Sequence, residues 1–306
     1  MSEQIYDVVI IGGGPGGYTG ALYTARAGLD TLVLEKFSAG GQMTQTSQID
    51  NYPGFDDGVD GFTLGFKMQA GAERFGAKTV QTEVLSVNLT DKIKTVETSE
   101  GTFRAKTVIV STGAEHRHLG IEHEDELVGR GVGYCATCDG MFYRDKTVVV
   151  VGGGNSAAAD ALFLSKICDK VILVHRRDNM RATKIYHEPL MKAENIEFLW
   201  DSVVDEFVFD EKITAIKVKN IKTESTSEVQ CDGVFISIGR VPETNMFKGQ
   251  LNIDEFGYII ADESTKTNIP GVFAVGDVRT KVLRQIVTAA ADGAVASYYA
   301  EEYLNE

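Results

Sequence analysis

The fold of the first part of the chain is decided by the stretch Asp7-Val-Val-Ile-Ile-Gly12-Gly-Gly-Pro-Gly-Gly17. Its run of β-branched residues predicts a short strand that is buried on both faces. The glycines that follow predict a tight turn into a helix that runs to about Ala27, and Thr31-Leu-Val-Leu34 predicts a second strand that ends in Glu35. A strand, a glycine-rich turn, a helix and a second strand with a terminal acid form the pattern of a dinucleotide-binding unit.

Each glycine of this turn has a separate physical role. Gly12 permits the tight turn, Gly14 lets the backbone approach a pyrophosphate, and Gly17 lets the helix pack closely on the strand. The helix that starts in this turn, around Pro15, offers free N–H groups and a positive dipole end to phosphates. Glu35 is placed to accept hydrogen bonds from an adenosine ribose, which a merely tight strand–helix turn would not require.

The same unit returns later in the chain. Val148-Val-Val-Val-Gly152-Gly-Gly-Asn-Ser-Ala157 aligns without a gap with the first stretch, at a constant offset of 140 residues that places Gly152 opposite Gly12. Alanine replaces the third glycine, which the fingerprint allows. The residues expected to contact a second nucleotide here are Gly152, Gly154, Asn155, Ser156 and Ala157. The sequence therefore predicts a duplicated nucleotide-binding unit.

One change between the two copies is informative. Where the first copy has Glu35, the second has His175, followed by Arg176 and Arg177, with Arg181 one turn further on. A carboxylate accepts a hydrogen bond from a free 2′-hydroxyl and repels a 2′-phosphate, whereas arginines offer charge-assisted, forked hydrogen bonds. The alternative is a solvated basic patch, but the offset lands on the position that discriminates between the cofactors. The second site is therefore expected to bind NADP.

A close pair of cysteines, Cys135-Ala-Thr-Cys138, lies between the two glycine turns. Such a pair can close a small, easily reduced disulfide ring or hold half of a metal site. A zinc site needs two further ligands, but Cys168 and Cys231 stand alone and no suitably spaced histidine pair follows. No metal is expected. A dithiol between two dinucleotide sites instead suggests that electrons pass from one nucleotide, through another, to a disulfide.

Composition excludes several classes of protein. The chain has 43% apolar and 24% charged residues, which is ordinary for a globular protein, and its net charge of −14 argues against a nucleic-acid binder. No apolar run approaches the roughly 20 residues that span a bilayer. The N-terminal residues have no basic region and lead straight into a strand, so no signal peptide is expected. With only four cysteines, the protein is expected to be cytoplasmic.

The remaining patterns predict elements around the two units. A helix is expected over about Thr63–Phe75 and a closing helix over about Arg284–Leu304. Strands are expected at about Lys78–Val87, Lys94–Thr98, Thr102–Lys106, Thr107–Ser111, Gly233–Ile238 and Gly271–Val275. Four further strands are expected to form a meander: Glu197–Asp201, Val203–Phe209, Ala215–Asn220 and Glu224–Gln230.

Taken together, these motifs resemble the low-molecular-weight thioredoxin reductases over essentially the whole chain. The matching pieces are Gly12–Gly17, Gly40-Gly41-Gln42, Cys135–Gly140, Gly152–Ala157, His175–Arg181 and Gly271–Asp277 with Arg284-Gln285. The resemblance implies an α/β fold of two Rossmann-like, three-layer domains, the second inserted in the first. It places FAD in residues 1–114 and 246–306, and NADPH in residues 115–245. It also implies a homodimer.

The resemblance further implies a role for each site residue. Cys138 is the sulfur next to the flavin, Cys135 is the thiolate that attacks oxidised thioredoxin, and Asp139 donates and accepts the proton of the dithiol. A helix cap is the competing role for Asp139. The further cofactor contacts that it implies are Gly41, Gln42, Asn51, Thr112, Gly113, Gly239, Gly276, Asp277, Arg284 and Gln285. The activity is that of an NADPH-dependent thioredoxin-disulfide reductase.

The chain departs from the family pattern at three places. Glu122-His123-Glu124 stands where Pro-Gly-Glu is often found, Ala159 replaces a frequent acid, and Ile286 replaces a usual alanine. Two other functions remain open at this point. They are a non-catalytic flavoprotein redox sensor, and a disulfide reductase with another thioredoxin-like partner or another electron donor.

Overall fold

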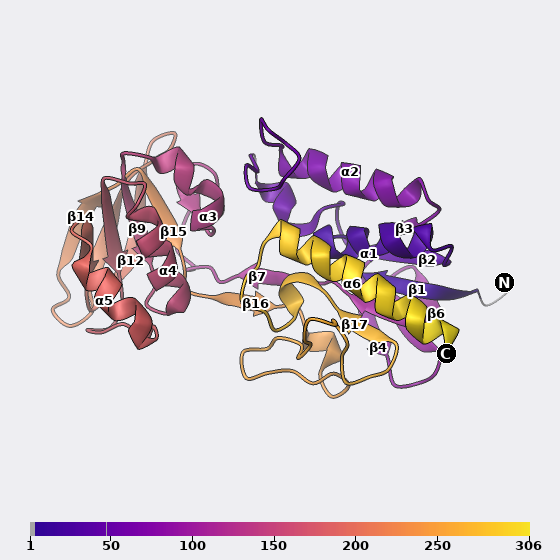
Figure 1. The fold of residues 1–306 in the computed structure, drawn as a ribbon. Helices are drawn as coiled ribbons and strands as arrows, with labels where there is room; N and C mark the ends of the chain where they lie inside the picture. The colour runs from indigo at the N-terminus through magenta and orange to yellow at the C-terminus, as the bar shows by residue number, and fades with distance from the viewer. Residues whose placement is uncertain (1–3, 47) are drawn as a thin grey trace. The chain divides into compact units, whose positions relative to one another are not determined.

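The computed structural model describes residues 4–46 and 48–306, and it divides into two compact units. Unit 1 consists of Met1–Glu115 and Val241–Glu306, and unit 2 is the insertion His116–Arg240 (Figure 1). The expected boundaries lie close by, at 114/115 and 245/246. Where the chain passes from one unit to the other, two short strands, β7 (Ala114–His116) and β16 (Arg240–Pro242), form a two-stranded sheet.

Unit 1 is built around a parallel sheet with β1 at its centre. β1 (Ile5–Ile11) pairs with β2 (Thr31–Glu35) on one side and with β6 (Gly101–Val110) on the other, and the sheet continues to β3 (Lys78–Gln81) and β17 (Val272–Ala274). The apolar core of β1 is almost completely buried, as expected of a strand covered on both faces. The carboxyl ends of the parallel strands therefore meet at one edge, where α/β sheets place ligands.

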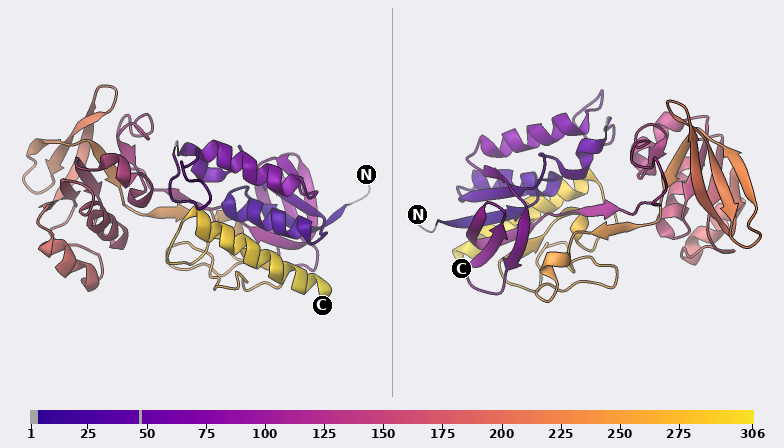
Figure 2. Two further views of the ribbon diagram at one scale, coloured as in Figure 1. Left: turned by 45° about the horizontal axis from the view of Figure 1, so that its top comes forward. Right: turned by 180° about the vertical axis from the view of Figure 1, so that it is seen from behind.

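One face of this sheet is covered by helices. α1 (Pro15–Arg26) and α6 (Ile286–Asn305) lie side by side, and α2 (Gly61–Glu73) packs on α1 (Figures 1 and 2). The core on this face combines alternate residues of β1 with alanines of the two helices, including Ala21 and Ala296. Small residues let the helices approach each other and the sheet closely, and Gly16 and Gly20 of α1 pack against Gly293 of α6.

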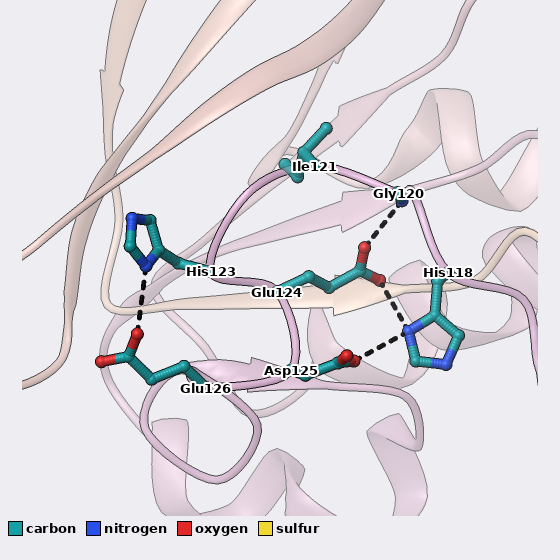
Figure 3. A pocket seen from close by; sticks show the side chains of 7 residues that line it. All are labelled: His118, Gly120, Ile121, His123, Glu124, Asp125 and Glu126. Carbon is teal, nitrogen blue, oxygen red and sulfur yellow. Dashed lines mark hydrogen bonds and ion pairs between the residues drawn. The ribbon is translucent and has the colours of Figure 1, made fainter.

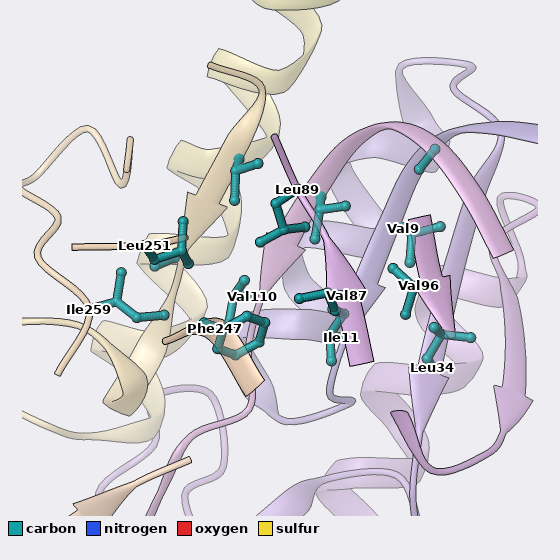
Figure 4. Packing of buried hydrophobic residues seen from close by; sticks show 14 of the residues in the cluster. Val9, Ile11, Leu34, Val87, Leu89, Val96, Val110, Phe247, Leu251 and Ile259 are labelled. Carbon is teal, nitrogen blue, oxygen red and sulfur yellow. The ribbon is translucent and has the colours of Figure 1, made fainter. Parts of the chain in front are cut away.

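The other face is covered by an antiparallel layer. β4 (Val84–Asn88) and β5 (Lys94–Thr98) pair with each other, and β5 continues onto the first half of β6. Val9 and Ile11 point into this layer and meet apolar residues from the last third of the chain, including Phe247, as Figure 4 shows. Unit 1 therefore has three layers: helices, a parallel sheet and an antiparallel layer.

Unit 2 repeats this architecture. Its parallel sheet runs in the order β11 (Ile196–Leu199), β10 (Lys170–Val174), β9 (Thr147–Val151), β15 (Gly233–Ile236) and β8 (Val132–Gly133). α4 and α5 pack on one face, and an antiparallel meander of three strands covers the other. The bounds are α4 (Asn155–Leu164), α5 (Lys184–Lys192), β12 (Ser202–Phe209), β13 (Ile213–Asn220) and β14 (Thr226–Gln230).

The structure corrects four of the predicted strands. The expected strand Lys78–Val87 is two strands, because Thr82 turns the chain away after its N–H bonds the carbonyl of Glu35 at 2.8 Å. The two expected strands over 102–111 are one, β6. The expected meander strand Glu197–Asp201 is instead β11, the parallel edge next to β10. A short apolar run does not reveal whether its neighbour is parallel or antiparallel.

Four short 3-10 helices occur in residues 4–46 and 48–306, and the first and the last of them carry predicted site residues. They are η1 (Gly41–Gln45), η2 (Gly140–Tyr143), η3 (Asn245–Phe247) and η4 (Gly276–Val278). Across residues 4–46 and 48–306, no helix has the length and hydropathy that a bilayer crossing needs.

Candidate active site

The first glycine turn is shaped to receive a dinucleotide. Gly12 has a φ of +99°, and a side chain at Gly17 would collide with the carbonyl of Gly12, so both positions require glycine. A Cβ added at Gly14 would meet nothing within 4 Å, which leaves space for a ligand to reach the backbone. α1 begins there without a side-chain cap, so its first N–H groups are not bonded by a capping side chain. These features fit the pyrophosphate of FAD.

Glu35 is held at the same turn. Its Oε2 accepts a hydrogen bond from the N–H of Gly13 at 2.5 Å, and its Oε1 accepts one from Phe37 at 3.1 Å. The carboxylate is only 8% exposed. The acid at the end of β2 is therefore fixed directly beside the glycine turn, which is the position that recognition of a ribose requires.

Two loops expected to touch the flavin are tethered to the rest of unit 1. The N–H of Gly40 bonds the carbonyl of Gly13 at 2.8 Å, and a Cβ added at Gly41 would lie 3.4 Å from the Cα of Gly14, so this loop runs beside the first glycine turn. Gln42 Nε2 donates to the carbonyl of Ala114 at 2.7 Å. Asn51 Nδ2 donates to Gln285 Oε1 at 3.0 Å, so two residues that are far apart in the sequence and were both predicted at the site lie together.

Thr112 and Gly113, which follow β6 after Ser111, lie near the point where the chain leaves unit 1. Thr112 Oγ1 donates to the carbonyl of Glu243 at 2.8 Å, and the N–H of Glu243 bonds the carbonyl of Gly113 at 3.1 Å. Gly113 has a φ of +75°, a conformation that favours glycine. At the return passage Gly239, with a φ of +106°, accepts a backbone hydrogen bond from Arg117 at 3.0 Å. The structure thus gives Thr112 a side-chain tether, and Gly113 and Gly239 backbone roles, besides the cofactor contacts predicted for them.

The remaining flavin candidates lie on one segment after β17. Gly276 has a φ of +72°, and its N–H is already bonded to the carboxylate of Asp292 at 2.8 Å, so it shapes the turn rather than donating to a ligand. Asp277 follows it directly. Arg284 stacks over the ring of Tyr258 at 4.0 Å, and Gln285 is the N-cap of α6.

The second glycine turn repeats the first with an imidazole in place of the carboxylate. His175 packs against Gly153, the counterpart of Gly13, so closely that no side chain fits at that glycine. Burial, together with the charges of Arg177 and Arg176, lowers the pKa of His175 below its ordinary 6.5, so the ring is neutral at pH 7. Its Nε2 is buried, and the described part of the chain offers it no hydrogen-bond partner. A buried polar atom of this kind fits a site that a ligand completes.

The arginine-bearing loop is joined to this turn by the backbone. The N–H groups of Arg181 and Ala182 donate to the carbonyl of Gly153 at 2.7 and 3.1 Å. Asn155 Oδ1 accepts from the N–H of Thr183 at 2.8 Å, next to the uncapped start of α4. Arg176, Arg177 and Arg181 are exposed, and Gly154 again borders open space. Unit 2 therefore offers phosphate donors and a cluster of arginines, which fit NADPH.

The cysteine pair is a disulfide at the start of a short helix in unit 2. The sulfurs of Cys135 and Cys138 are bonded, and α3 (Ala136–Asp139) begins immediately after Cys135. The N–H groups of Cys138 and Asp139 both donate to the carbonyl of Cys135 at 3.1 Å. Burial raises the pKa of Asp139 from 3.8 to about 6, so its carboxyl group can hold or release a proton near neutral pH.

Asp139→Asn is expected to stabilise the chain at neutral pH while slowing disulfide turnover. The folded pKa of about 6 lies above the unfolded value of 3.8, so the wild-type chain loses stability as pH rises between these values. The variant lacks this loss, and its free energy of unfolding should exceed the wild type by about 2–3 kcal/mol above pH 7. Below about pH 4 the two should converge. Urea unfolding from pH 4 to 8 measures the difference.

The matched control for this prediction is Asp210→Asn, which changes an exposed carboxylate of the same unit. It should leave the pH dependence as it is. A stability gap for Asp139→Asn that stays constant with pH would mean that burial of the Asp139 charge is not its cause.

Sequence reasoning missed a network just before the cysteines. The buried carboxylate of Glu124 accepts hydrogen bonds from the N–H groups of Leu119 and Gly120 at 3.0 and 2.8 Å, and from the hydroxyl of Tyr134 at 2.8 Å. The ring of Tyr134 stacks on His116. Because Tyr134 precedes Cys135, the network fixes the chain that leads into the redox pair. Only the motif position of Glu124 hinted at it.

An open hollow of about 250 Å³ lies beside this network (Figure 3). Its polar groups pair with one another: His118 Nδ1 lies 3.1 Å from Asp125 Oδ1, and His123 Nδ1 lies 3.0 Å from Glu126 Oε2. His123 has a φ of +65° where relatives often carry glycine, so the departure from the family pattern keeps the glycine-like backbone.

Comparison with known proteins agrees with this geometry. Residues 6–293 match the family model described as pyridine nucleotide-disulphide oxidoreductase. The chain belongs to this family.

Within the family, the similarity lies with thioredoxin reductases. Those of Listeria innocua and Streptomyces coelicolor are each 48% identical over 305 residues, covering 99% of this chain and 95% of the relative. The crystal structure of thioredoxin reductase from Streptococcus pyogenes matches with a TM-score of 0.93 and 42% identity over 99% of both chains. The predicted resemblance and the α/β class with Rossmann-like domains are confirmed.

Proposed function

We propose that the chain is an NADPH-dependent thioredoxin-disulfide reductase that uses FAD. The observation that carries the proposal is the Cys135–Cys138 disulfide in a unit that also holds the second glycine turn and its arginines. The complete first fingerprint in unit 1 supports a separate flavin site. When bound, FAD would supply the two-electron relay between NADPH and the disulfide.

Two electrons and two protons convert the Cys135–Cys138 disulfide to two thiols. The Cys135 thiolate then attacks one sulfur of oxidised thioredoxin and forms a mixed disulfide. Cys138 attacks Cys135, which restores the internal disulfide and releases reduced thioredoxin. Asp139, with its raised pKa, takes the proton from one thiol and returns it to the leaving sulfur.

The proposal also covers the assembly, the location and the partners of the chain. The chain works as a homodimer in the cytoplasm. In that compartment the two buried free cysteines, Cys168 and Cys231, stay reduced. NADPH is the preferred electron donor because of Arg176, Arg177 and Arg181. Thioredoxin is the protein substrate, as the names of the relatives suggest.

The purified chain is expected to carry FAD and to be bleached by NADPH under anaerobic conditions. Oxidised thioredoxin added afterwards should restore the flavin absorbance, and repeated additions of both substrates should turn over. A redox sensor would be reduced by NADPH without turnover, and a reductase for another partner would turn over only with a different thioredoxin-like protein. A correctly folded chain that shows no flavin absorbance and takes up no FAD would refute the proposal.

A further inference from the structure

A single buried carboxylate in unit 1 binds three residues of the segment that follows β17. Asp292, in the second turn of α6, is 6% exposed. Its Oδ2 accepts hydrogen bonds from the N–H of Gly276 at 2.8 Å, from Arg279 Nε at 2.9 Å and from Lys281 Nζ at 2.8 Å, while Oδ1 accepts from Arg279 Nη2 at 2.7 Å. Four donors from three points of one segment therefore converge on one side chain.

The cations of this cluster are buried too. Arg279 is 2% exposed, and the side chain of Lys281 is 6% exposed. Arg279 Nη1 also donates to the carbonyls of Ala261 and Thr280, and Lys281 Nζ donates to the carbonyl of Thr288. Two buried cations thus share one buried carboxylate. Removing that carboxylate would take from both cations their buried anion and leave Arg279 only the exposed Glu263, 4.0 Å away, so the geometry of the segment depends on Asp292.

The position of Asp292 is fixed from the other side by the first glycine turn. Its neighbour Gly293 packs against the backbone of Gly16 and Gly20 in α1, so closely that no side chain fits. α6 therefore crosses α1 at the level of the turn that is shaped for a pyrophosphate. Asp292 links this crossing to the segment 276–285.

The flavin candidates of the last third are interleaved with these tethers. Asp277 lies between the bonded residues Gly276 and Arg279, and Arg284 Nη2 donates to the carbonyl of Arg279 at 3.3 Å. Burial alone would raise the pKa of Asp292, but the hydrogen bonds from Arg279 and Lys281 hold it below its ordinary 3.8, so the carboxylate is ionised at neutral pH.

We propose that Asp292 is a positioning residue for FAD: it fixes the turn that carries Asp277, and it acts through that turn without touching the cofactor. The inference rests on the proposed FAD site. The competing explanation is that the cluster stabilises the core of unit 1 and has no effect on the cofactor. The two differ in what happens to FAD affinity in a chain that is still folded.

The test measures FAD binding by full-length chains freed of flavin, with quenching of flavin fluorescence as the signal. Asp292→Asn is expected to raise the Kd for FAD about tenfold or more, which corresponds to at least about 1.4 kcal/mol. Glu301→Gln, which changes an exposed carboxylate on the same helix, should bind FAD like the wild type. Near-UV circular dichroism and a cooperative thermal transition establish that each chain, unit 1 included, is folded.

A double-mutant cycle separates positioning from general stabilisation. If Asp292 acts through Asp277, Asp292→Asn should have a smaller effect in an Asp277→Asn background than alone. Fully additive effects, or wild-type affinity in folded Asp292→Asn, would overturn the inference while leaving the FAD site intact. A wild-type chain that binds no FAD would overturn both.

Lys281→Gln provides a second test if Asp292→Asn does not fold. This variant retains the Arg279–Asp292 pair but loses one tether, and its Kd for FAD should rise at least severalfold. Unchanged affinity in that chain would contradict the proposed role of the cluster.

Discussion

Cys135→Ser and Cys138→Ser are each expected to reduce thioredoxin turnover to the level of a protein-free control, while NADPH still reduces the bound flavin. A serine hydroxyl cannot form a disulfide. Without the disulfide, the two electrons taken up by the flavin cannot pass to thioredoxin. The proposed nucleotide sites lie on other elements, at the starts of α1 and α4, so hydride transfer should not need the sulfurs. Stopped-flow absorbance measures flavin reduction, and a coupled thioredoxin assay measures turnover.

Cys168→Ala is the matched control, because it removes a thiol of the same unit that takes no part in the disulfide. Burial raises the pKa of Cys168 to about 11, so it forms almost no thiolate at pH 7 and cannot substitute for the pair. Its variant should turn over like the wild type. Loss of flavin reduction in both serine variants would instead assign the pair a structural role.

The second large effect is expected in cofactor preference. Arg176→Ala/Arg177→Ala should lower kcat/KM for NADPH by about a hundredfold or more, since each charged hydrogen bond to a phosphate contributes about 1.5–3 kcal/mol. kcat/KM for NADH, which has no 2′-phosphate, should change little. Steady-state kinetics with both nucleotides measure the ratio.

Lys212→Ala removes an exposed positive charge of unit 2 outside the arginine loop and should leave the NADPH/NADH ratio unchanged. The ratio should also fall with rising salt in the wild type, because exposed charges are screened. An unchanged ratio in the double variant would show that the arginines are a solvated patch and that another feature selects the cofactor.

The sequence pattern alone predicted those parts of the fold whose residues are neighbours in the chain. The strand, glycine turn and helix at Gly12 and at Gly152 are contiguous in the chain, and the burial of β1 and β9 follows from their apolar runs. The pairing of β11 was mispredicted because partner choice depends on residues outside the strand. The same reason explains why β3 and β4 were read as one strand.

The candidate site residues fall into the same two groups: some follow from local motifs, and others depend on contacts made only on folding. The cysteines and arginines were visible because motif spacing alone identifies them. Glu124 and Asp292 were not, because their importance arises from burial and from partners brought together by folding. A lone acid in a helix or loop is usually solvated, so only the structure distinguishes these two from the many exposed carboxylates.

Because unit 2 is inserted in unit 1, its synthesis is complete before that of unit 1. A ribosome completes residues 116–240 before it makes β17 and α6, which supply a strand beside β6 and the helix beside α1. The inserted unit can therefore fold on the emerging chain while the first half of unit 1 still exposes an apolar sheet and helix. A nascent chain that stops before residue 272 contains all of unit 2 but only part of unit 1. Its exposed apolar sheet makes such a product a natural target for chaperones and proteases.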